Sequence, residues 1–337
     1  MAEQQASSAD EDKGAGHTGP AAVVEAARAA AQPPETPPET PVGGSGLAAL
    51  EAVNAAALAA VPGFREGRTP GALPAVDARF HQFKNRHPYH GFVEVEVEGE
   101  RFVMLSTNDD LVAMSFFWHG PDAWEPMSMH LWRAWAQEAD RVLDVGAFSG
   151  VYALLAAATA PSASVLAVEA ARRTYGRLLS NIQANGFERR VRALNRAAAS
   201  GPGLVSFNRF RGENILGIGD SFLAKEGLEV LSSEEQVETV SLDALTAQEA
   251  FVPDLIKIDV EGAELMVLEG MATLLSETRP RLLVEVTPET SEEAARILEG
   301  HGYRIAAVDE AALTCLPLKG PMPRVGNLVA EHRGSTG

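Results

Sequence analysis

The sequence predicts an α/β protein with a mostly parallel central sheet covered by helices on both faces, plus an N-terminal β-hairpin and helix. Two observations carry this prediction. From residue 141 onward, short apolar segments alternate with segments of helical length. Most of the apolar segments are hydrophobic throughout, which is typical of parallel strands that are buried on both faces.

The expected elements follow one another along the chain. A strand at 142–145 leads through a glycine-containing turn into a helix at 151–159. Ligands bind at the carboxyl ends of the strands in such sheets, so we expect the chemistry there. Further strands are expected at 164–168, 191–195, 255–260, 282–286, 303–308 and 327–330, and further helices at 173–184, 263–275 and 291–300.

The chain is predicted to divide into three parts. Residues 1–75 read as a disordered Ala/Pro-rich tail with one candidate short helix, because dense proline blocks helix and sheet. Residues 76–140 are expected to form a hairpin and a cap segment, with a helix at about 128–138. Residues 141–335 form the ligand-binding domain.

The candidate helix in the tail is defined by a set of apolar residues at near-helical spacing. A weakly helical linker is favoured over a helix docked on the domain. We therefore expect that removing residues 1–75 leaves the melting temperature nearly unchanged. The apolar residues are Leu47, Leu50, Val53, Leu58 and Val61.

The composition of the 337-residue chain is acidic, with 28 Lys+Arg against 46 Asp+Glu and a net charge of −18. This balance argues against a nucleic-acid or anionic-membrane partner. The single cysteine, Cys315, excludes an intrachain disulfide and fits a reducing compartment. No apolar run of membrane-span length and no secretory signal is apparent. We expect a cytoplasmic protein with a small-molecule partner.

The first motif is the segment LDVGAFSG at 143–150. Gly146 allows the backbone to turn tightly and to approach a ligand. The N–H groups at the start of the following helix are expected to face a polar or anionic group. The dinucleotide pattern G-x-G-x-x-G is absent, because only Gly146 and Gly150 are present, with Phe148 between them.

Acidic residues mark the ends of the other strands. Glu169 ends the second strand, where an acid accepts hydrogen bonds from a ribose diol. Lys257, Asp259 and Glu261 alternate on one side of a later strand end. Burying such charges without partners is costly, so we expect them to meet each other or a ligand. Glu285 faces either the site or a structural arginine such as Arg281.

Four segments together resemble the FkbM family of methyltransferases. They are LDVGAFSGVYALL, the strand-end VEA, DLIKIDVEGAELMVLEGM and LLVEV, and the resemblance covers about residues 124–310. Where the family reads DVGANxG, Phe148 replaces the asparagine. The resemblance implies the class I S-adenosylmethionine-dependent Rossmann-like fold. It also implies methylation of hydroxyl groups on sugars or natural products.

The resemblance implies S-adenosylmethionine as the cofactor and gives each matched position a role. Gly146, Ala147 and Gly150 would line the methionine and ribose, Glu169 would hold the ribose hydroxyls, and residues 195–197 would edge the adenine. Asp259 would face the methionine amino group or the acceptor hydroxyl, and Glu125 would help to bind the methionine end. The expected cofactor-binding residues are Glu125, Asp144, Gly146, Ala147, Phe148, Ser149, Gly150, Glu169, Ala170, Asn195, Ala197 and Asp259.

Methylation of an alcohol requires a base that takes the hydroxyl proton. Asp259 or Glu261 is the expected catalytic residue, with His119 or His130 as the runner-up. A divalent cation between Asp259 and Glu285 is an open option, and a reaction without metal is favoured. The acceptor site is expected to be built from the hairpin, residues 115–124 and the insert at 207–223.

Three alternative functions stay open. One is an NAD-dependent oxidoreductase, which the missing dinucleotide pattern counts against. Another is a non-catalytic Rossmann-like binding module, which the intact strand-end acids Glu169 and Asp259 count against. The third is a methyltransferase that acts on a protein or on RNA, and the net charge of −18 counts against RNA.

Overall fold

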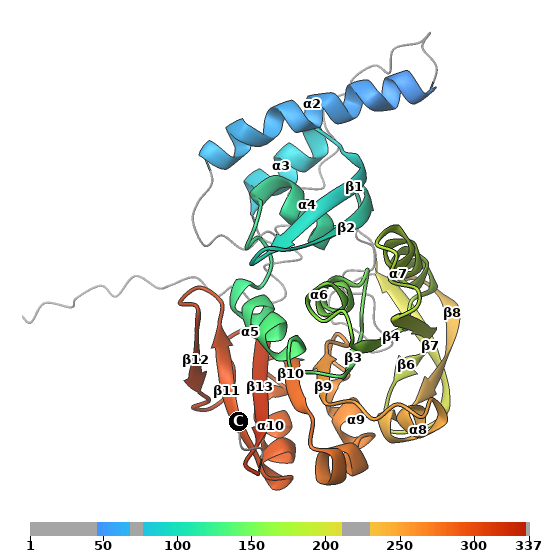
Figure 1. The fold of residues 1–337 in the computed structure, drawn as a ribbon, viewed down its shortest axis with the longest axis vertical. Helices are drawn as coiled ribbons and strands as arrows, with labels where there is room; N and C mark the ends of the chain where they lie inside the picture. The colour runs from blue at the N-terminus through green and yellow to red at the C-terminus, as the bar shows by residue number, and fades with distance from the viewer. Residues whose placement is uncertain (1–45, 68–76, 211–229, 335–337) are drawn as a thin grey trace, which may run out of the picture.

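The computed structural model describes residues 46–67, 77–210 and 230–334. Residues 1–45 and 68–75 of the tail expected at 1–75, and residues 211–223 of the expected acceptor insert, therefore lie outside the described residues. An N-terminal unit lies above one end of a large α/β domain (Figure 1).

The α/β domain is built on one eight-stranded sheet with the order β12-β11-β13-β10-β9-β3-β4-β5. Strands β10, β9, β3, β4 and β5 run parallel, and β13, β11 and β12 are joined antiparallel at one edge. This arrangement confirms the predicted α/β fold with a mostly parallel sheet. The strands are β3 (Arg141–Val145), β4 (Ser164–Glu169), β5 (Val191–Asn195), β9 (Leu255–Ile258), β10 (Arg281–Val286), β11 (Tyr303–Asp309), β12 (Thr314–Pro317) and β13 (Gly326–His332).

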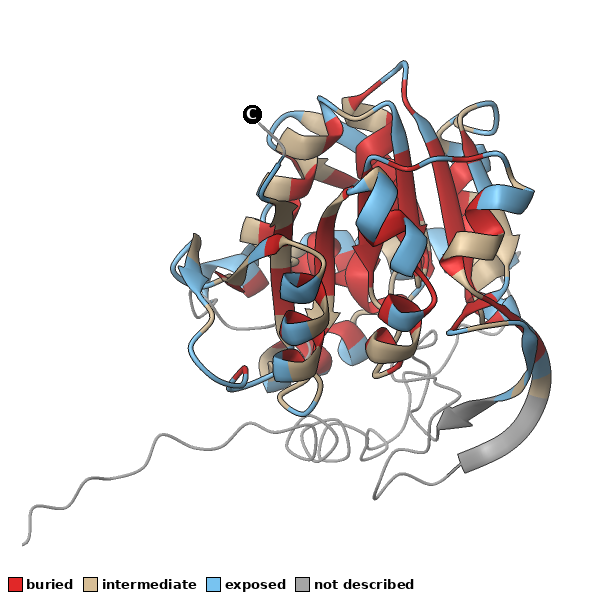
Figure 2. Ribbon diagram, turned by 90° about the horizontal axis from the view of Figure 1, so that it is seen from below, coloured by how far each residue is buried: buried red, intermediate tan, exposed pale blue. Residues whose placement is uncertain are grey.

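Side chains alternate between the two faces of this sheet, and each face has its own hydrophobic core. Val142 and Leu255 pack on one face, whereas Leu143 and Ile256 pack on the other. Most of the sheet is buried between the two layers of helices (Figure 2). The first face is covered by α5 (Pro126–Ala136), α6 (Val151–Thr159) and α7 (Arg172–Ala184), and the second by α8 (Leu242–Gln248), α9 (Glu264–Glu269), η2 (Leu274–Thr278) and α10 (Ser291–Gly300).

The helix expected at 263–275 is divided into α9 and the π-helical turn η2. The division falls at Gly270, which ends α9. A Cβ on Gly270 would lie 2.2 Å from the carbonyl oxygen of Ala199, so the backbone packs closely against a neighbouring segment there. Tertiary packing, rather than local propensity, sets this break.

A small second sheet was not predicted. It contains β6 (Ala197–Ala198), β8 (Val230–Val240) and β7 (Gly203–Phe210), in that order. The first residues of the expected acceptor insert, 207–210, are therefore the end of a strand. No strand is expected at 230–240 from the sequence, because the charged residues of this segment obscure the alternation of apolar and polar positions.

The N-terminal unit confirms the predicted hairpin and adds three helices around it. Strands β1 (His90–Val97) and β2 (Glu100–Thr107) pair antiparallel from His90↔Thr107 to Val97↔Glu100. The helices are α2 (Gly46–Glu66), α3 (Ala78–Arg86) and α4 (Leu111–His119).

The helix α2 is docked, so the weakly helical linker favoured by the sequence is wrong. Ala57 and Phe64 are completely buried. Asn54 and the backbone of His90 exchange two hydrogen bonds of 2.8 and 2.9 Å. The face of α2 that packs on the N-terminal unit is not the one predicted from the apolar residues of the sequence, because Leu47 and Leu58 of that set are exposed.

Among the described helices, α2 alone is long and apolar enough to span a membrane by length and composition. This corrects the sequence analysis, which found no apolar run of that length. The high mean hydropathy of α2 comes largely from its many alanines, and its buried residues face the rest of the N-terminal unit.

The N-terminal unit is fixed to the α/β domain by Asn181 of α7 and by Asn185, which caps the C-terminus of that helix. The Asn181 side chain accepts a 2.7 Å hydrogen bond from Leu105 N, and Asn185 both accepts from Val103 N and donates to Val103 O at 2.8 Å. These bonds satisfy backbone groups of β2 that no strand of the large sheet pairs with. They place the start of α4 beside the carboxyl ends of the parallel strands.

Candidate active site

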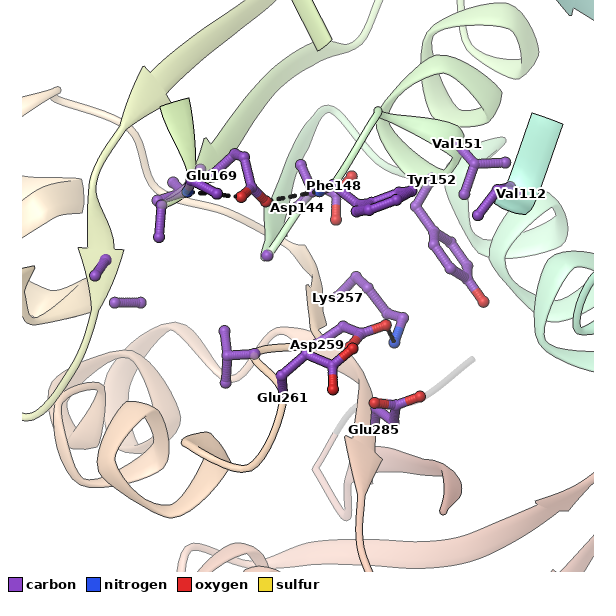
Figure 3. A pocket seen from close by; sticks show the side chains of 18 of the residues that line it. Val112, Asp144, Phe148, Val151, Tyr152, Glu169, Lys257, Asp259, Glu261 and Glu285 are labelled. Atoms are coloured by element: carbon purple, nitrogen blue, oxygen red, sulfur yellow. Dashed lines mark hydrogen bonds and ion pairs between the residues drawn. The ribbon is translucent and has the colours of Figure 1, made fainter. Parts of the chain in front are cut away.

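A cavity of about 220 Å³ opens at the carboxyl ends of β3, β4, β9 and β10. One part of its wall is acidic and the other is apolar, as the side chains in Figure 3 show. The apolar part includes the first residues of α4 and α6. The lining residues are Leu111, Val112, Trp124, Asp144, Gly146, Ala147, Phe148, Val151, Tyr152, Val168, Glu169, Ala170, Ala171, Arg196, Ala197, Ala198, Lys257, Asp259, Val260, Glu261 and Glu285.

The turn after β3 requires a glycine at position 146. Gly146 has φ +78°, and a Cβ there would lie 1.6 Å from the carbonyl oxygen of Asp259. The N–H groups of Gly146 and Ala147 donate to Val168 O at 2.8 and 3.0 Å, and Phe148 N donates to Glu169 Oε2 at 2.9 Å. These three amides are therefore used inside the protein.

Glu169 lies at the end of β4 and closes the other side of the turn. Its second oxygen accepts a 2.9 Å hydrogen bond from Ala171 N. Burial raises the pKa of this carboxyl to about 8, although the two backbone N–H groups act in the opposite direction. Each oxygen retains a second lone pair with which to bind a ligand hydroxyl.

Asp144 is buried at the end of β3 and lines the floor of the cavity. Its Oδ2 accepts a 2.9 Å hydrogen bond from Ala153 N in the first turn of α6. Burial raises the pKa of Asp144 to about 7, and the positive charge of Lys257 opposes that rise. Asp144 therefore ties β3 to α6 as well as facing the cavity.

Lys257 is the centre of a buried polar network, with a side chain that is 1% exposed. Its ammonium lies 3.3 Å from Asp259 Oδ2 and donates to Asn327 Oδ1 at 3.0 Å. Burial by itself lowers the pKa of Lys257, but the carboxylates of Asp259, Glu125 and Glu285 outweigh it and raise that pKa. The expectation that Lys257 and Asp259 meet each other is confirmed.

Glu125 joins this network from the start of α5. It accepts hydrogen bonds from the Tyr152 hydroxyl and, at 3.2 Å, from Asn327 Nδ2. Burial raises the pKa of the Glu125 carboxyl, and Lys257 opposes the rise. Glu125 does not line the cavity itself but holds Tyr152, which does.

Glu285 faces the cavity, which decides between the two roles left open for it. Arg281 instead binds Glu138 at 2.6 Å. Burial, and then the charge of Asp259, raise the pKa of Glu285 well above its ordinary value, and Lys257 opposes the rise. Within the described chain, no hydrogen bond or ion pair reaches its carboxylate.

Three non-glycine residues with positive φ lie in or beside this site. They are Glu125 (φ 39°), Phe148 (φ 52°) and Glu261 (φ 54°). Such conformations cost about 1–3 kcal/mol each and cluster at functional sites. Asparagine, the FkbM family residue at position 148, tolerates this conformation well, whereas Phe148 adopts it with a bulky ring.

Residues 144–305 match the family model described as the methyltransferase FkbM domain. This stretch of the chain is similar to an FkbM methyltransferase domain. The match confirms the family resemblance and the class I fold, and S-adenosylmethionine is the cofactor of this domain. It also favours a methyltransferase over the oxidoreductase alternative. No curated protein matches the chain.

Several solved structures match parts of this chain. Methyltransferase FkbM from Methylobacillus flagellatus KT is 16% identical, with a TM-score of 0.39 over 57% of this chain and 44% of that protein. The match thus spans less than half of that relative. The precorrin-6y C5,15-methyltransferase from Geobacter metallireducens GS-15 is 16% identical, with a TM-score of 0.36. That match covers 61% of this chain and 87% of that protein. An O-methyltransferase from Bacillus cereus, in complex with SAH, is 17% identical, with a TM-score of 0.36. That match covers 61% of this chain and 80% of that protein.

Most of the predicted site residues of the FkbM domain meet at the cavity. Those that line it are Asp144, Gly146, Ala147, Phe148, Glu169, Ala170, Ala197, Asp259 and Glu261. Glu125 acts through Tyr152, as described above.

Three predicted cofactor-binding residues support the cavity from outside its lining. Asn195 Nδ2 donates to Glu169 O at 2.9 Å and to Ala170 O at 2.7 Å, so it braces the end of β4. Ser149 is fully buried beneath the turn. Gly150 begins α6 with φ +104°, packed against Leu178. Their contacts are with the protein rather than with the cavity.

Neither predicted histidine lines the cavity. His119 is buried in the N-terminal unit beside Asp77. His130 is half exposed, and its Nδ1 lies 2.5 Å from Glu98. The runner-up role of these histidines as the base is therefore wrong for this arrangement of the chain.

The sequence reasoning missed the apolar wall of the cavity. Leu111 and Val112 reach the site only because the N-terminal unit docks on α7, and no local pattern marks them. Tyr152 lies in the first turn of α6 and has no distinguishing signal as a cavity residue. Trp124, by contrast, belongs to the segment 115–124 that was expected to help build the acceptor site. Within the described ranges, no group of three or more His, Cys, Asp or Glu side chains is placed to hold a metal ion.

Proposed function

We propose that this chain transfers a methyl group from S-adenosylmethionine to a hydroxyl group of a small sugar or natural-product acceptor. The observation that carries the proposal is the chemistry of the cavity. Its wall is rich in carboxylates, and three amides of its glycine turn are already bonded. Such a cavity suits a cation and suits a pyrophosphate poorly.

The residues present fit this cofactor. When bound, S-adenosylmethionine supplies an electrophilic methyl group on a positively charged sulfur. Glu169 would accept hydrogen bonds from the ribose hydroxyls, beside Gly146 and Ala147. Ala197 and its neighbours at the end of β5 would edge the adenine, and Asp259 would face the methionine ammonium or the acceptor hydroxyl.

The acceptor would bind against the apolar wall. Leu111, Val112 and Trp124 supply carbon surface for a ring or a chain. Asp259 and Glu261 would accept hydrogen bonds from acceptor hydroxyls at the opposite wall. The several carboxylates disfavour an anionic acceptor, because like charges repel strongly where water is partly excluded.

A labelled methyl group tests the proposal directly. S-adenosylmethionine with a ¹³C methyl is incubated with the full chain and a panel of sugars, phenols and polyketide alcohols. Carbon NMR then distinguishes a methyl on oxygen from one on nitrogen, carbon or sulfur. We expect a new methoxy signal. A methylated amine or carbon as the sole product contradicts hydroxyl methylation, while leaving methyl transfer itself intact.

A further inference from the structure

We infer that Glu285 is the general base of this site and takes the proton of the acceptor hydroxyl. The inference rests on the proposed hydroxyl methylation and deepens it. Figure 3 places the Glu285 carboxylate beside Asp259 and Lys257 at the cavity. Apart from Glu261, the other acid–base groups discussed below are each committed elsewhere, as the following contacts show.

Two of the other carboxylates are tied to the backbone. Asp144 accepts a hydrogen bond from Ala153 N, and Glu169 accepts one at each oxygen, from Phe148 N and Ala171 N. Both residues therefore hold the turn around the cofactor. Moving either one to follow a reacting proton would break bonds that shape the cavity.

The groups nearest to Glu285 are also committed. The Asp259 carboxylate is already balanced by the Lys257 ammonium at 3.3 Å. Lys257 is itself a protonated donor to Asn327, and the Tyr152 hydroxyl donates to Glu125. None of these three groups is set to accept a proton from an incoming hydroxyl.

The sheet register aims Glu285 at the cavity. Leu283 of β10 lies beside Lys257 of β9, so Glu285, two residues further on, points to the same face beyond the ammonium. Asn327 lies directly opposite Glu285 on β13, and its own amide is bonded to Lys257, Glu125 and Ser128. Glu285 is thus positioned by a strand, which holds a catalytic group more firmly than a loop does.

Glu261 is the remaining carboxylate of the wall and the alternative base. It follows β9 on a loop, in the left-handed region. Glu285 comes from within a strand, β10, and burial raises its pKa well above the ordinary value. A carboxylate with a raised pKa is the stronger base once it is ionised.

The charged groups around Glu285 explain how it is ionised for the reaction. Asp259, Glu261 and Glu125 disfavour its negative charge, and Lys257 favours it. A bound cation adds positive charge to the cavity, which promotes loss of the Glu285 proton. In the transfer, the acceptor oxygen bonds to the methyl carbon and the methyl–sulfur bond breaks with its electron pair remaining on sulfur. The hydroxyl proton moves to Glu285, which becomes a neutral acid.

The first test uses the hydroxyl compound that gives the strongest methoxy signal in the ¹³C panel. We expect Glu285→Gln to lower kcat by about 10²-fold or more. The affinity for S-adenosylhomocysteine, measured by calorimetry, should stay within a few-fold. Glu285→Asp should restore part of the rate. A Glu285→Gln variant with an unchanged kcat overturns the inference, whereas failure of the wild type to methylate any hydroxyl contradicts the proposed function instead.

The second test needs no acceptor. Sinefungin, an unreactive analogue with an amine at the methyl position, is titrated calorimetrically in buffers of different ionisation enthalpy. We expect the wild type to release more protons on binding than Glu285→Gln does. The control is Glu264→Gln, a buried carboxyl outside the cavity lining that accepts a bond from Gly262 N and should retain the wild-type proton count. Equal proton release by wild type and Glu285→Gln overturns the inference.

Discussion

Gly146 and Asp259 approach each other so closely that a Cβ on Gly146 would lie 1.6 Å from the Asp259 carbonyl oxygen. This contact joins the turn after β3 to the end of β9, where Asp259 N also donates to Val145 O at 2.9 Å. The glycine therefore sets the distance between the cofactor turn and the acidic side of the site. Because of this contact, a side chain at position 146 would disturb both the turn after β3 and the end of β9.

Gly146→Ala tests this contact. We expect loss of S-adenosylhomocysteine binding and a marked fall in melting temperature, because the clash is with backbone that cannot move alone. Gly176→Ala in α7 is the control, since a Cβ there meets nothing within 4 Å. It should stabilise the protein by up to about 1 kcal/mol. Normal ligand binding by Gly146→Ala would contradict this account of the turn.

Asp144 should make stability depend on pH. Burial raises its pKa from 3.8 to about 7. The folded state therefore keeps a proton that the unfolded state loses, so this group costs stability as pH rises between about 4 and about 7. Asp144→Asn can still accept the Ala153 N–H and removes this cost.

Urea unfolding at about pH 5 and about pH 8 measures the effect of Asp144. We expect the free energy of unfolding of Asp144→Asn, relative to wild type, to increase between these values by on the order of a few kcal/mol. Parallel pH profiles for the two proteins would show that Asp144 titrates normally in the folded state.

Phe64 should account for most of the docking energy of α2. Its ring is completely buried, and its centroid lies 5.3 to 5.4 Å from those of Phe83 and Trp118. Phe64→Ala should cost about 3–5 kcal/mol. Leu58→Ala, on an exposed side of the same helix, should change stability by less than about 0.5 kcal/mol. Chemical denaturation compares them, and similar effects of the two changes would count against the docked helix.

Removal of residues 1–75 should likewise lower the melting temperature. This reverses the expectation from the sequence, because the deletion removes Phe64 and the Asn54 bonds to His90. An unchanged melting temperature would favour the linker interpretation after all.

The Asn185 side chain should contribute to the free energy of unfolding. Its amide oxygen accepts a hydrogen bond from Val103 N, and its amide nitrogen donates one to Val103 O. Asn185→Ala leaves Val103 N and O without these partners, so we expect a loss of about 1–3 kcal/mol. Gln183→Ala, at an exposed position in the last turn of α7, is the control and should be nearly neutral. A neutral Asn185→Ala in denaturant unfolding would show that the N-terminal unit is held by other contacts.

The sequence predicted the α/β domain well because its signals are local. Apolar runs such as 142–145 mark buried strands, and Gly146 marks the turn that follows. The acids at the strand ends, Glu169 and Asp259, follow from the rule that parallel strands end at one edge. These signals need no knowledge of distant contacts.

The remainder of the site could not be predicted because it depends on tertiary contacts. Leu111 and Val112 reach the cavity through the docking of β2 on α7. Asn195 has the sequence position of a ligand residue but bonds to Glu169 O and Ala170 O. The sequence leaves two roles open for Glu285, at the site or against Arg281, and only the ion pair between Arg281 and Glu138 decides between them.

The most direct test of the account is calorimetric titration of the full chain with S-adenosylhomocysteine and, separately, with NAD. The account predicts binding of S-adenosylhomocysteine alone, strongly weakened by Glu169→Ala, which removes the carboxylate facing the ribose. Binding of NAD without S-adenosylhomocysteine would contradict the central claim that this acidic cavity is a methyl-donor site.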